Sequence, residues 1–194
     1  MFVGSDMVAG WEKRYGAPVE WQHLQSLTPA DYEGIKASQK DGRAHDITLH
    51  IENRGRIAVI AKPIYPAGLF RTPSGGLHVG ETLEEGAPRE AYEETGLHIR
   101  LERYLLRAKV TFDDGTRKIH WTTHVFTATT DDEVVHPIDT KEIREARWAL
   151  PEEFAGFEAV MRHASRGGLR YRAALHQQVA RLLPLFSKSA QQQS

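Results

Sequence analysis

The chain has 194 residues, of which 40% are hydrophobic, and a formal net charge of -1 at pH 7, so its length suffices for one well-buried domain. It contains no cysteine, which excludes disulfide bonds, thiolate zinc sites and cysteine nucleophiles, and its near-zero charge offers no general basic field for nucleic acid. No stretch has the length of a membrane span and the first residues lack the pattern of a signal peptide, so we expect a cytoplasmic protein whose mature form is the whole chain.

Residues 1–45 precede the first clear strand pattern. Thr28, Pro29 and Asp31 are typical of a helix N-terminus, and they predict a helix that extends to about Lys40. The aromatic and charged residues before this helix show no clear period. We therefore predict that residues 1–45 form an N-terminal extension that is partly helical.

Strand patterns begin at Asp46. Apolar residues alternate over residues 47–51, residues 53–55 read Asn-Arg-Gly as in a tight turn, and residues 57–61 form a continuous apolar run. A turn-rich loop that contains Gly75 follows, directly before an acidic segment. Strand, glycine-rich loop and helix thus occur in the order that brings backbone close to a ligand.

An acidic helix is predicted between Thr82 and Gly96. Thr82 followed by Glu85 is typical of a capping box, and a glycine just after the last periodic residue is a typical helix stop. Pro88 disagrees with a regular helix, because proline removes a backbone donor and clashes with the preceding turn. Either the first turn is distorted or the regular helix starts close to Pro88.

Glu90, Glu93 and Glu94 stand at positions i, i+3 and i+4, so they share one face in both versions of this helix. Like charges at this spacing repel, and we expect a bound cation to stabilise them. Carboxylate oxygens suit hard divalent cations, and Mg²⁺ is commonly shared between carboxylates and substrate phosphates. The pattern predicts a Mg²⁺ site, in which Mn²⁺ can substitute, and a phosphate-bearing substrate, with a solvated acidic helix as the alternative.

The second half of the chain predicts further strands and two helices. Two β-rich runs are joined by Asp-Asp-Gly, a strong hairpin signal, and a proline followed by two glutamates opens a helix. The last helix is amphipathic, and its apolar face packs on the domain or on a second subunit, which would give a homodimer. The predicted ranges are strands at 99–112, 118–129 and 146–149, a helix opening at 151–153, a helix at 170–186, a main domain at 46–186 and a flexible polar tail at 187–194.

Residues 75–97 read GGLHVGETLEEGAPREAYEETGL, which resembles the Nudix box of the MutT-like Nudix hydrolases. That motif is a glycine, five residues, a glutamate, seven residues, and then Arg-Glu-aliphatic-any-Glu-Glu-any-Gly-aliphatic. Every fixed position is filled in register, although Ala91 is small for an aliphatic position. The resemblance covers about residues 46–157, and it implies an α/β fold, the Nudix α/β/α sandwich with a mixed β-sheet, in agreement with the strand and helix patterns.

The resemblance also implies a reaction and the residues that perform it. Nudix hydrolases cleave a pyrophosphate bond in a nucleoside diphosphate linked to another group X, so a small-molecule nucleotide derivative is the expected substrate. Arg89 is expected to hold the glutamates in place by pairing with Glu81 or Glu93. The expected metal ligands are Gly75, through its carbonyl, Glu90, Glu93 and Glu94, and the expected catalytic residues are Arg89, Glu93 and Glu94.

The general base and the phosphate-binding residues carry weaker signals. Glu142 precedes a strand in a loop rich in turn residues, and it is similar in position to a loop glutamate that some family members use as the base. An ordinary solvated acid is the alternative, and Asp139 and Glu145 are weaker candidates for the same role. The residues that flank or lie within the glycine-rich loop, and are expected to bind the substrate, are Lys62, Arg71 and His78.

Three alternatives stay open beside a nucleotide hydrolase. The first is a non-catalytic nucleotide-sensing or regulatory module, against which the intact glutamates argue, and the second is a prenyl diphosphate isomerase, whose chemistry is associated with a cysteine that this chain lacks. The third is RNA binding through basic residues at 162–172, although a net charge of -1 does not favour nucleic acid. Four aromatic residues either pack in the core or stack on a nucleobase: Phe70, Tyr104, His120 and Trp121.

Overall fold

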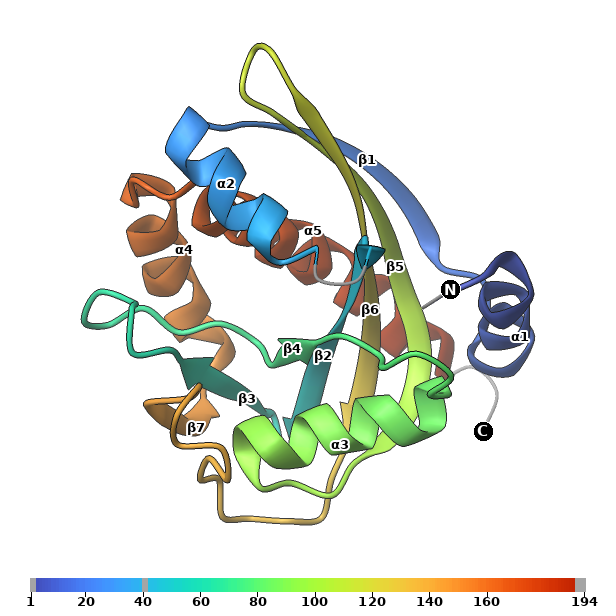
Figure 1. Ribbon diagram of the computed structural model, residues 1–194. Helices are drawn as coiled ribbons and strands as arrows, with labels where there is room; N and C mark the ends of the chain where they lie inside the picture. The colour runs from blue at the N-terminus through green and yellow to red at the C-terminus, as the bar shows by residue number, and fades with distance from the viewer. Residues whose placement is uncertain (1–2, 40–41, 191–194) are drawn as a thin grey trace.

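The central element is a mixed β-sheet with helices on both faces (Figure 1). The computed structural model describes residues 3–39 and 42–190, of which 185–190 are described by backbone alone. Within these residues the strands are β1 (Val19–Ser26), β2 (His45–Asn53), β3 (Arg56–Ala61), β4 (Ser74–Gly75), β5 (Arg100–Asp113), β6 (Lys118–Thr129) and β7 (Glu145–Ala149). The helices are α1 (Ser5–Tyr15), α2 (Pro29–Ala37), α3 (Leu83–Thr95), α4 (Phe154–His163) and α5 (Gly167–Ala190), and the 3-10 turn η2 (Pro151–Glu153) precedes α4.

The strand order is β1-β5-β6-β2-β3-β7, and the short β4 pairs with β2. β2 runs parallel to β6 and antiparallel to β3, so the sheet is mixed. Leu49 and Ile51 of β2 pack with Leu83 and Ala91 of α3 on one face, where α1 adds its buried Trp11. On the other face α2 and α5 join an apolar cluster with β5 and β6. The predicted α/β/α sandwich is confirmed.

The predicted strands at 47–51, 57–61, 99–112, 118–129 and 146–149 are confirmed by β2, β3, β5, β6 and β7, with ends that differ by at most two residues. The turn between β2 and β3 has φ angles of 52° at Arg54 and 76° at Gly55. Two consecutive positive φ angles are what a type I′ hairpin turn requires, which explains the Asn-Arg-Gly signal.

β1 was not among the predicted strands, and it pairs in parallel with β5 along the edge of the sheet. Its residues alternate between half-buried and exposed, yet His23 and Gln25 are on the half-buried side while Leu24 is 63% exposed. Polar and apolar residues therefore do not alternate as they do in a typical surface strand. With β1 in the sheet and Trp11 in the core, residues before Asp46 form part of the central structure.

α3 begins at Leu83, so Pro88 lies inside the helix and the alternative of a start near Pro88 is wrong. The first turn is held by Glu85, whose carboxylate accepts hydrogen bonds from the Thr82 N–H at 3.0 Å and the Thr82 hydroxyl at 2.8 Å. Close packing explains the glycine at position 86, because a Cβ atom there would lie 2.4 Å from a methyl group of Leu77. The cap and the close contact with Leu77 keep this turn helical despite the proline.

The final helix is longer than the predicted range of 170–186. α5 starts at Gly167 and continues through residues 187–190, where a flexible tail was predicted, because those four residues include neither glycine nor proline to end the helix. Residues 191–194 of the predicted tail, and Lys40 at the predicted end of α2, lie outside the described residues. Within the part of the chain that the structure describes, no helix is both long and apolar enough to cross a membrane.

Candidate active site

The C-terminal half of α3 carries the three predicted carboxylates. Glu94 is only 5% exposed, because its side chain points toward β4. There its carboxylate accepts a hydrogen bond from the Ser74 backbone N–H at 2.8 Å and lies 3.5 Å from Nη2 of Arg71. Burial raises the pKa of Glu94, against the opposing charges of Arg71 and Lys62. Glu94 thus joins the acidic helix α3 to the glycine-rich loop.

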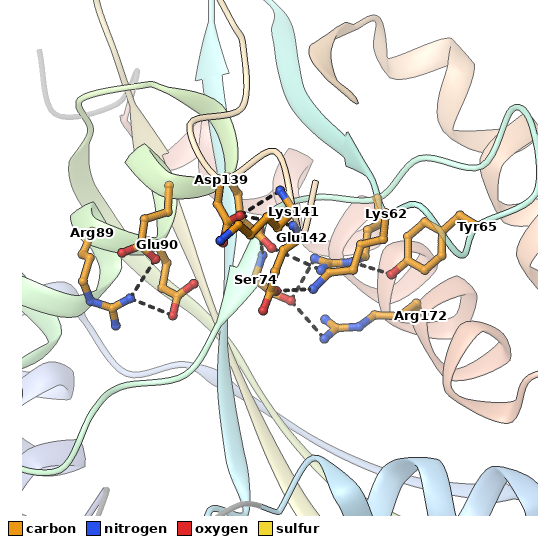
Figure 2. Close-up of polar contacts among 12 residues, drawn as sticks. Lys62, Tyr65, Ser74, Arg89, Glu90, Asp139, Lys141, Glu142 and Arg172 are labelled. Atoms are coloured by element: carbon orange, nitrogen blue, oxygen red, sulfur yellow. Dashed lines mark hydrogen bonds and ion pairs between the residues drawn. The ribbon is translucent and has the colours of Figure 1, made fainter. Parts of the chain in front are cut away.

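Arg89 links the other carboxylates of this region (Figure 2). Its Nε and Nη2 donate to Glu81 at 2.7 and 2.9 Å, and its Nη1 donates to Glu90 at 3.0 Å and to Glu93 at 3.1 Å. The hydrogen bonds with Glu81 are the main cause of a raised pKa for Arg89, and they lower the pKa of Glu81 to about 2. Arg89 therefore contacts both of its predicted partners, Glu81 and Glu93.

Gly75 lies directly against Glu90. A Cβ atom at Gly75 would be 1.9 Å from the carboxyl carbon of Glu90, so any larger residue would force this carboxylate to move. Burial raises the pKa of Glu90, Arg89 lowers it, and the nearby charge of Glu94 raises it again. Clustered carboxylates in such a setting are a donor set that fits a hard cation such as Mg²⁺. Among residues 3–39 and 42–190, no three histidine or acidic side chains lie close enough together to hold a metal ion in their present positions.

Arg71, which was predicted to bind the substrate, is only 3% exposed. It donates hydrogen bonds to the Tyr65 hydroxyl and the Ser74 hydroxyl, both at 2.9 Å, and it faces Glu94. Burial opposes the charged form of Arg71, but the charges of Tyr65 and Glu94 raise its pKa overall. These contacts make Arg71 a support for β4 and Glu94. His78, by contrast, has a side chain that is 71% exposed.

Glu142, the predicted general base, is exposed on the loop before β7 and pairs with Lys62 at 3.0 Å (Figure 2). Asp139 shapes this loop, because its carboxylate accepts the backbone N–H of Glu142 at 3.2 Å. The loop is also joined to the end of α3, where the carbonyl of Glu93 accepts the N–H of Asp139 at 2.9 Å. The structure thus brings Lys62 and Glu142 together beside the acidic helix.

Arg172 and Asp46 were not among the predicted site residues, yet they lie beside Ser74. Nη2 of Arg172 lies 2.5 Å from the Asp46 carboxylate and 3.1 Å from the Ser74 hydroxyl, and Nη1 donates to the Thr48 hydroxyl at 2.9 Å. Burial raises the pKa of Asp46, but the charge of Arg172 and hydrogen bonds from neighbouring side chains lower it overall. Arg172 and Asp46 are too far apart in sequence for a local pattern to connect them.

Two of the other basic residues at 162–172, Arg162 and Arg170, are held by local contacts. Arg162 pairs with Glu158 at 2.9 Å, and Arg170 donates to the carbonyls of Ala164 and Ser165, both at 3.1 Å. These are contacts within or next to their own helices, as expected for arginines on a docked helix. They give no support to the RNA-binding alternative.

Two of the four aromatic candidates are core residues. Tyr104 is fully buried and stacks on Phe126 at a ring distance of 4.5 Å, and Phe70 packs against Phe157 at 5.5 Å. Trp121 is half-buried, lines a cavity beside Gly75, and donates its indole N–H to Asp46 at 2.8 Å. Trp121 is therefore the aromatic candidate from this group that lies next to the site.

Comparison with known proteins agrees with these features. The family model of the NUDIX domain matches residues 42–168. The NAD-capped RNA hydrolase NudC of Vibrio parahaemolyticus serotype O3:K6 (strain RIMD 2210633) is 28% identical over 102 residues, which are 53% of this chain and 36% of that protein. The protein of the same name from Vibrio atlanticus (strain LGP32) is 36% identical over 58 residues, or 30% of this chain and 22% of that protein.

The chain thus spans about a third or less of the length of these curated relatives. Among solved structures, a NUDIX hydrolase from Nitrosomonas europaea aligns with a TM-score of 0.47 and 18% identity over 69% of this chain and 89% of that chain. The NUDIX family model covers well over half of the residues of this chain, including every position of the acidic helix. The chain therefore belongs to the Nudix hydrolase family.

Proposed function

We propose that this chain is a Mg²⁺-dependent hydrolase that cleaves a pyrophosphate bond in a nucleoside diphosphate linked to a further group X. The observation that carries the proposal is the row of carboxylates on one face of α3 beside the glycine-rich loop. Glu90 lies against Gly75 and is linked to Glu93 by Arg89, and Glu94 accepts the Ser74 N–H. The positive charge of Lys62 acts on Glu94, so a cationic side chain is available beside these carboxylates for a phosphate group. Carboxylates on one side and cations on the other suit a metal-bound diphosphate.

In this proposal the glutamates bind the metal ion and the basic residues have supporting roles. Glu90, Glu93 and Glu94 would hold Mg²⁺, and Glu90 and Glu93 would turn to it from Arg89. When bound, the cation supplies neutralisation of charge on the phosphoryl oxygens and on the leaving group. Arg89 stays paired with Glu81, and Lys62 provides a charge for the diphosphate.

The experiment that tests the proposal is a substrate panel with and without metal. The panel contains ADP-ribose, NADH, dinucleoside polyphosphates, nucleoside triphosphates, nucleotide sugars and the NAD-capped RNA named for the curated relatives. We expect nucleoside monophosphate or phosphate release from at least one compound with Mg²⁺ or Mn²⁺, and its loss in EDTA, because the carboxylates alone repel a diphosphate. Equal rates with and without metal would contradict the metal role. Binding without turnover of any compound would favour the nucleotide-sensing alternative.

Glu142 is proposed as the general base that takes a proton from the attacking water. Its carboxylate pairs with Lys62, which would exchange this contact for a substrate phosphate and leave Glu142 free to accept a proton. Glu142→Gln is expected to lower kcat by about a hundredfold with little change in KM, as is typical for loss of a general base. The matched control is Glu152→Gln, which changes an exposed glutamate in η2. A Glu142→Gln enzyme with parental kcat would return Glu142 to an ordinary loop acid.

A further inference from the structure

A cavity of about 870 Å³ opens beside the acidic cluster, between the sheet and the helices α2 and α5. Ser74 and Gly75 form the part of its wall that faces the proposed metal site. Pockets that hold small ligands have volumes of about 300 to 1,000 Å³. The cavity is therefore large enough for a nucleotide, and it starts where the proposed diphosphate would lie.

α2 forms one wall of this cavity and lies beside α5 (Figure 1). Ala30, Gly34 and Ser38 stand at positions i, i+4 and i+8, so they occupy one face of the helical segment, and all three line the cavity. Their side chains are small, which leaves the space open. A Cβ atom at Gly34 would have no other heavy atom within 4 Å.

The chemistry of the remaining walls is divided between rings and cations. Trp121 is half-buried and supplies most of the aromatic surface, beside the nearly buried rings of Phe112 and Tyr171. Lys62, Arg166 and Arg172 supply positive charge. Arg166 is exposed and, within the described part of the chain, has no carboxylate partner. Bases stack on aromatic side chains, and phosphates bind arginine and lysine.

We propose that this cavity binds the nucleoside monophosphate half of the substrate, with α2 as the wall that limits its size. The inference rests on the proposed function, since it assigns the side of the pyrophosphate that enters the cavity. α2 and the residues Tyr171 and Arg172 lie outside the matched range 42–168. Segments on either side of the family match therefore shape the recognition of the nucleoside.

The test is equilibrium binding of AMP, GMP, CMP, UMP and ribose 5-phosphate to the full chain by calorimetry in Mg²⁺. We expect at least one nucleoside monophosphate to bind more tightly than ribose 5-phosphate, because only a base can use the aromatic wall. Gly34→Leu places a side chain in the cavity, and we expect it to weaken the binding of that nucleotide by about tenfold or more. Ribose 5-phosphate should be affected least.

Gly156→Leu is the matched control, because Gly156 is also a helical glycine with no heavy atom within 4 Å of an added Cβ, but lies in α4 away from the cavity wall. It should bind nucleotides as the parent does. Should Gly34→Leu fail to fold, Ser38→Leu places a similar obstruction one turn further, at the C-cap of α2. Parental nucleotide affinity in a folded Gly34→Leu or Ser38→Leu chain, or no preference for any nucleotide over ribose 5-phosphate, would overturn the assignment.

The binding experiment is separable from the test of catalysis, because nucleoside monophosphates have no pyrophosphate bond to cleave. If the substrate panel shows no turnover but Gly34→Leu still weakens nucleotide binding, the proposed function fails and the nucleoside site stands. If turnover depends on metal but Gly34→Leu changes neither binding nor KM, the nucleoside site fails and the proposed function stands.

Discussion

Replacing Glu93 by glutamine is expected to lower metal-dependent kcat by about a hundredfold or more, the usual scale for removing one electrostatic group from an active site. Glutamine keeps the size of the side chain and can still accept the hydrogen bond that Arg89 donates to Glu93 at 3.1 Å. It loses the negative charge that attracts a divalent cation. The measurement is kcat at saturating Mg²⁺ on the compound of the panel that turns over fastest.

Glu84→Gln is the matched control for this substitution. It also removes one negative charge from α3, but Glu84 contacts Arg14 and Tyr15 at the other end of the helix. We expect parental kcat from this variant. Because the side chain of Glu93 is 47% exposed, thermal unfolding should show that Glu93→Gln keeps its fold. Parental kcat in Glu93→Gln would remove Glu93 from the proposed site.

Replacing Arg172 by methionine is expected to lower the free energy of unfolding by about 3–5 kcal/mol, because it leaves the buried Asp46 carboxylate without its cation. The side chains of Arg172 and Asp46 are 18% and 7% exposed, so water replaces little of the lost interaction. For a domain of this size the loss corresponds to a fall in Tm of roughly 6–20 °C. Arg100→Met is the control, since Arg100 pairs with Asp131 in full solvent and its loss should leave Tm unchanged.

Measuring the Tm of the parent and of Arg172→Met at several pH values separates the effect of the lost charge from the effect of changed packing. In the parent, the folded-state pKa of Asp46 lies below its ordinary value, so the ion pair stabilises the fold at neutral pH and loses this contribution as pH falls through the folded pKa. In the variant, burial without a cation raises the pKa of Asp46, so acid protonates it and relieves the cost. The difference in Tm should therefore be largest near pH 7 and narrow below about pH 4. If the difference in Tm between parent and variant is the same near pH 7 and below about pH 4, the effect is due to packing.

The acidic helix could be predicted from the sequence because its determinants are local. The cap at Thr82, the stop at Gly96 and the shared face of the glutamates all act within a few residues of one another. Hairpins such as the β2–β3 turn follow for the same reason. Pro88 and Gly86 contradicted the local pattern, and the contact of Gly86 with Leu77 shows how tertiary packing resolved the conflict.

The cavity could not be predicted, since its walls come from segments at opposite ends of the chain. Arg172 carries no mark that distinguishes it from the exposed arginines nearby, and its role follows only once α5 places it over Asp46. β1 gave no signal because an edge strand that is half-buried on one side needs no strict alternation. These features depend on long-range pairing, to which periodicity and propensity do not respond.

The loop that carries Glu142 has no regular secondary structure over most of its length, yet it is attached to the C-terminus of α3. The carbonyl of Glu93 accepts N–H groups from Ile138 and Asp139, and the carbonyl of Thr95 accepts one from His136. Carbonyls in the last turn of a helix have no partners within the helix, so the loop supplies partners that water would otherwise provide. The conformational entropy of ordering this loop is thus spent during folding, and the candidate base is already in place when a substrate arrives.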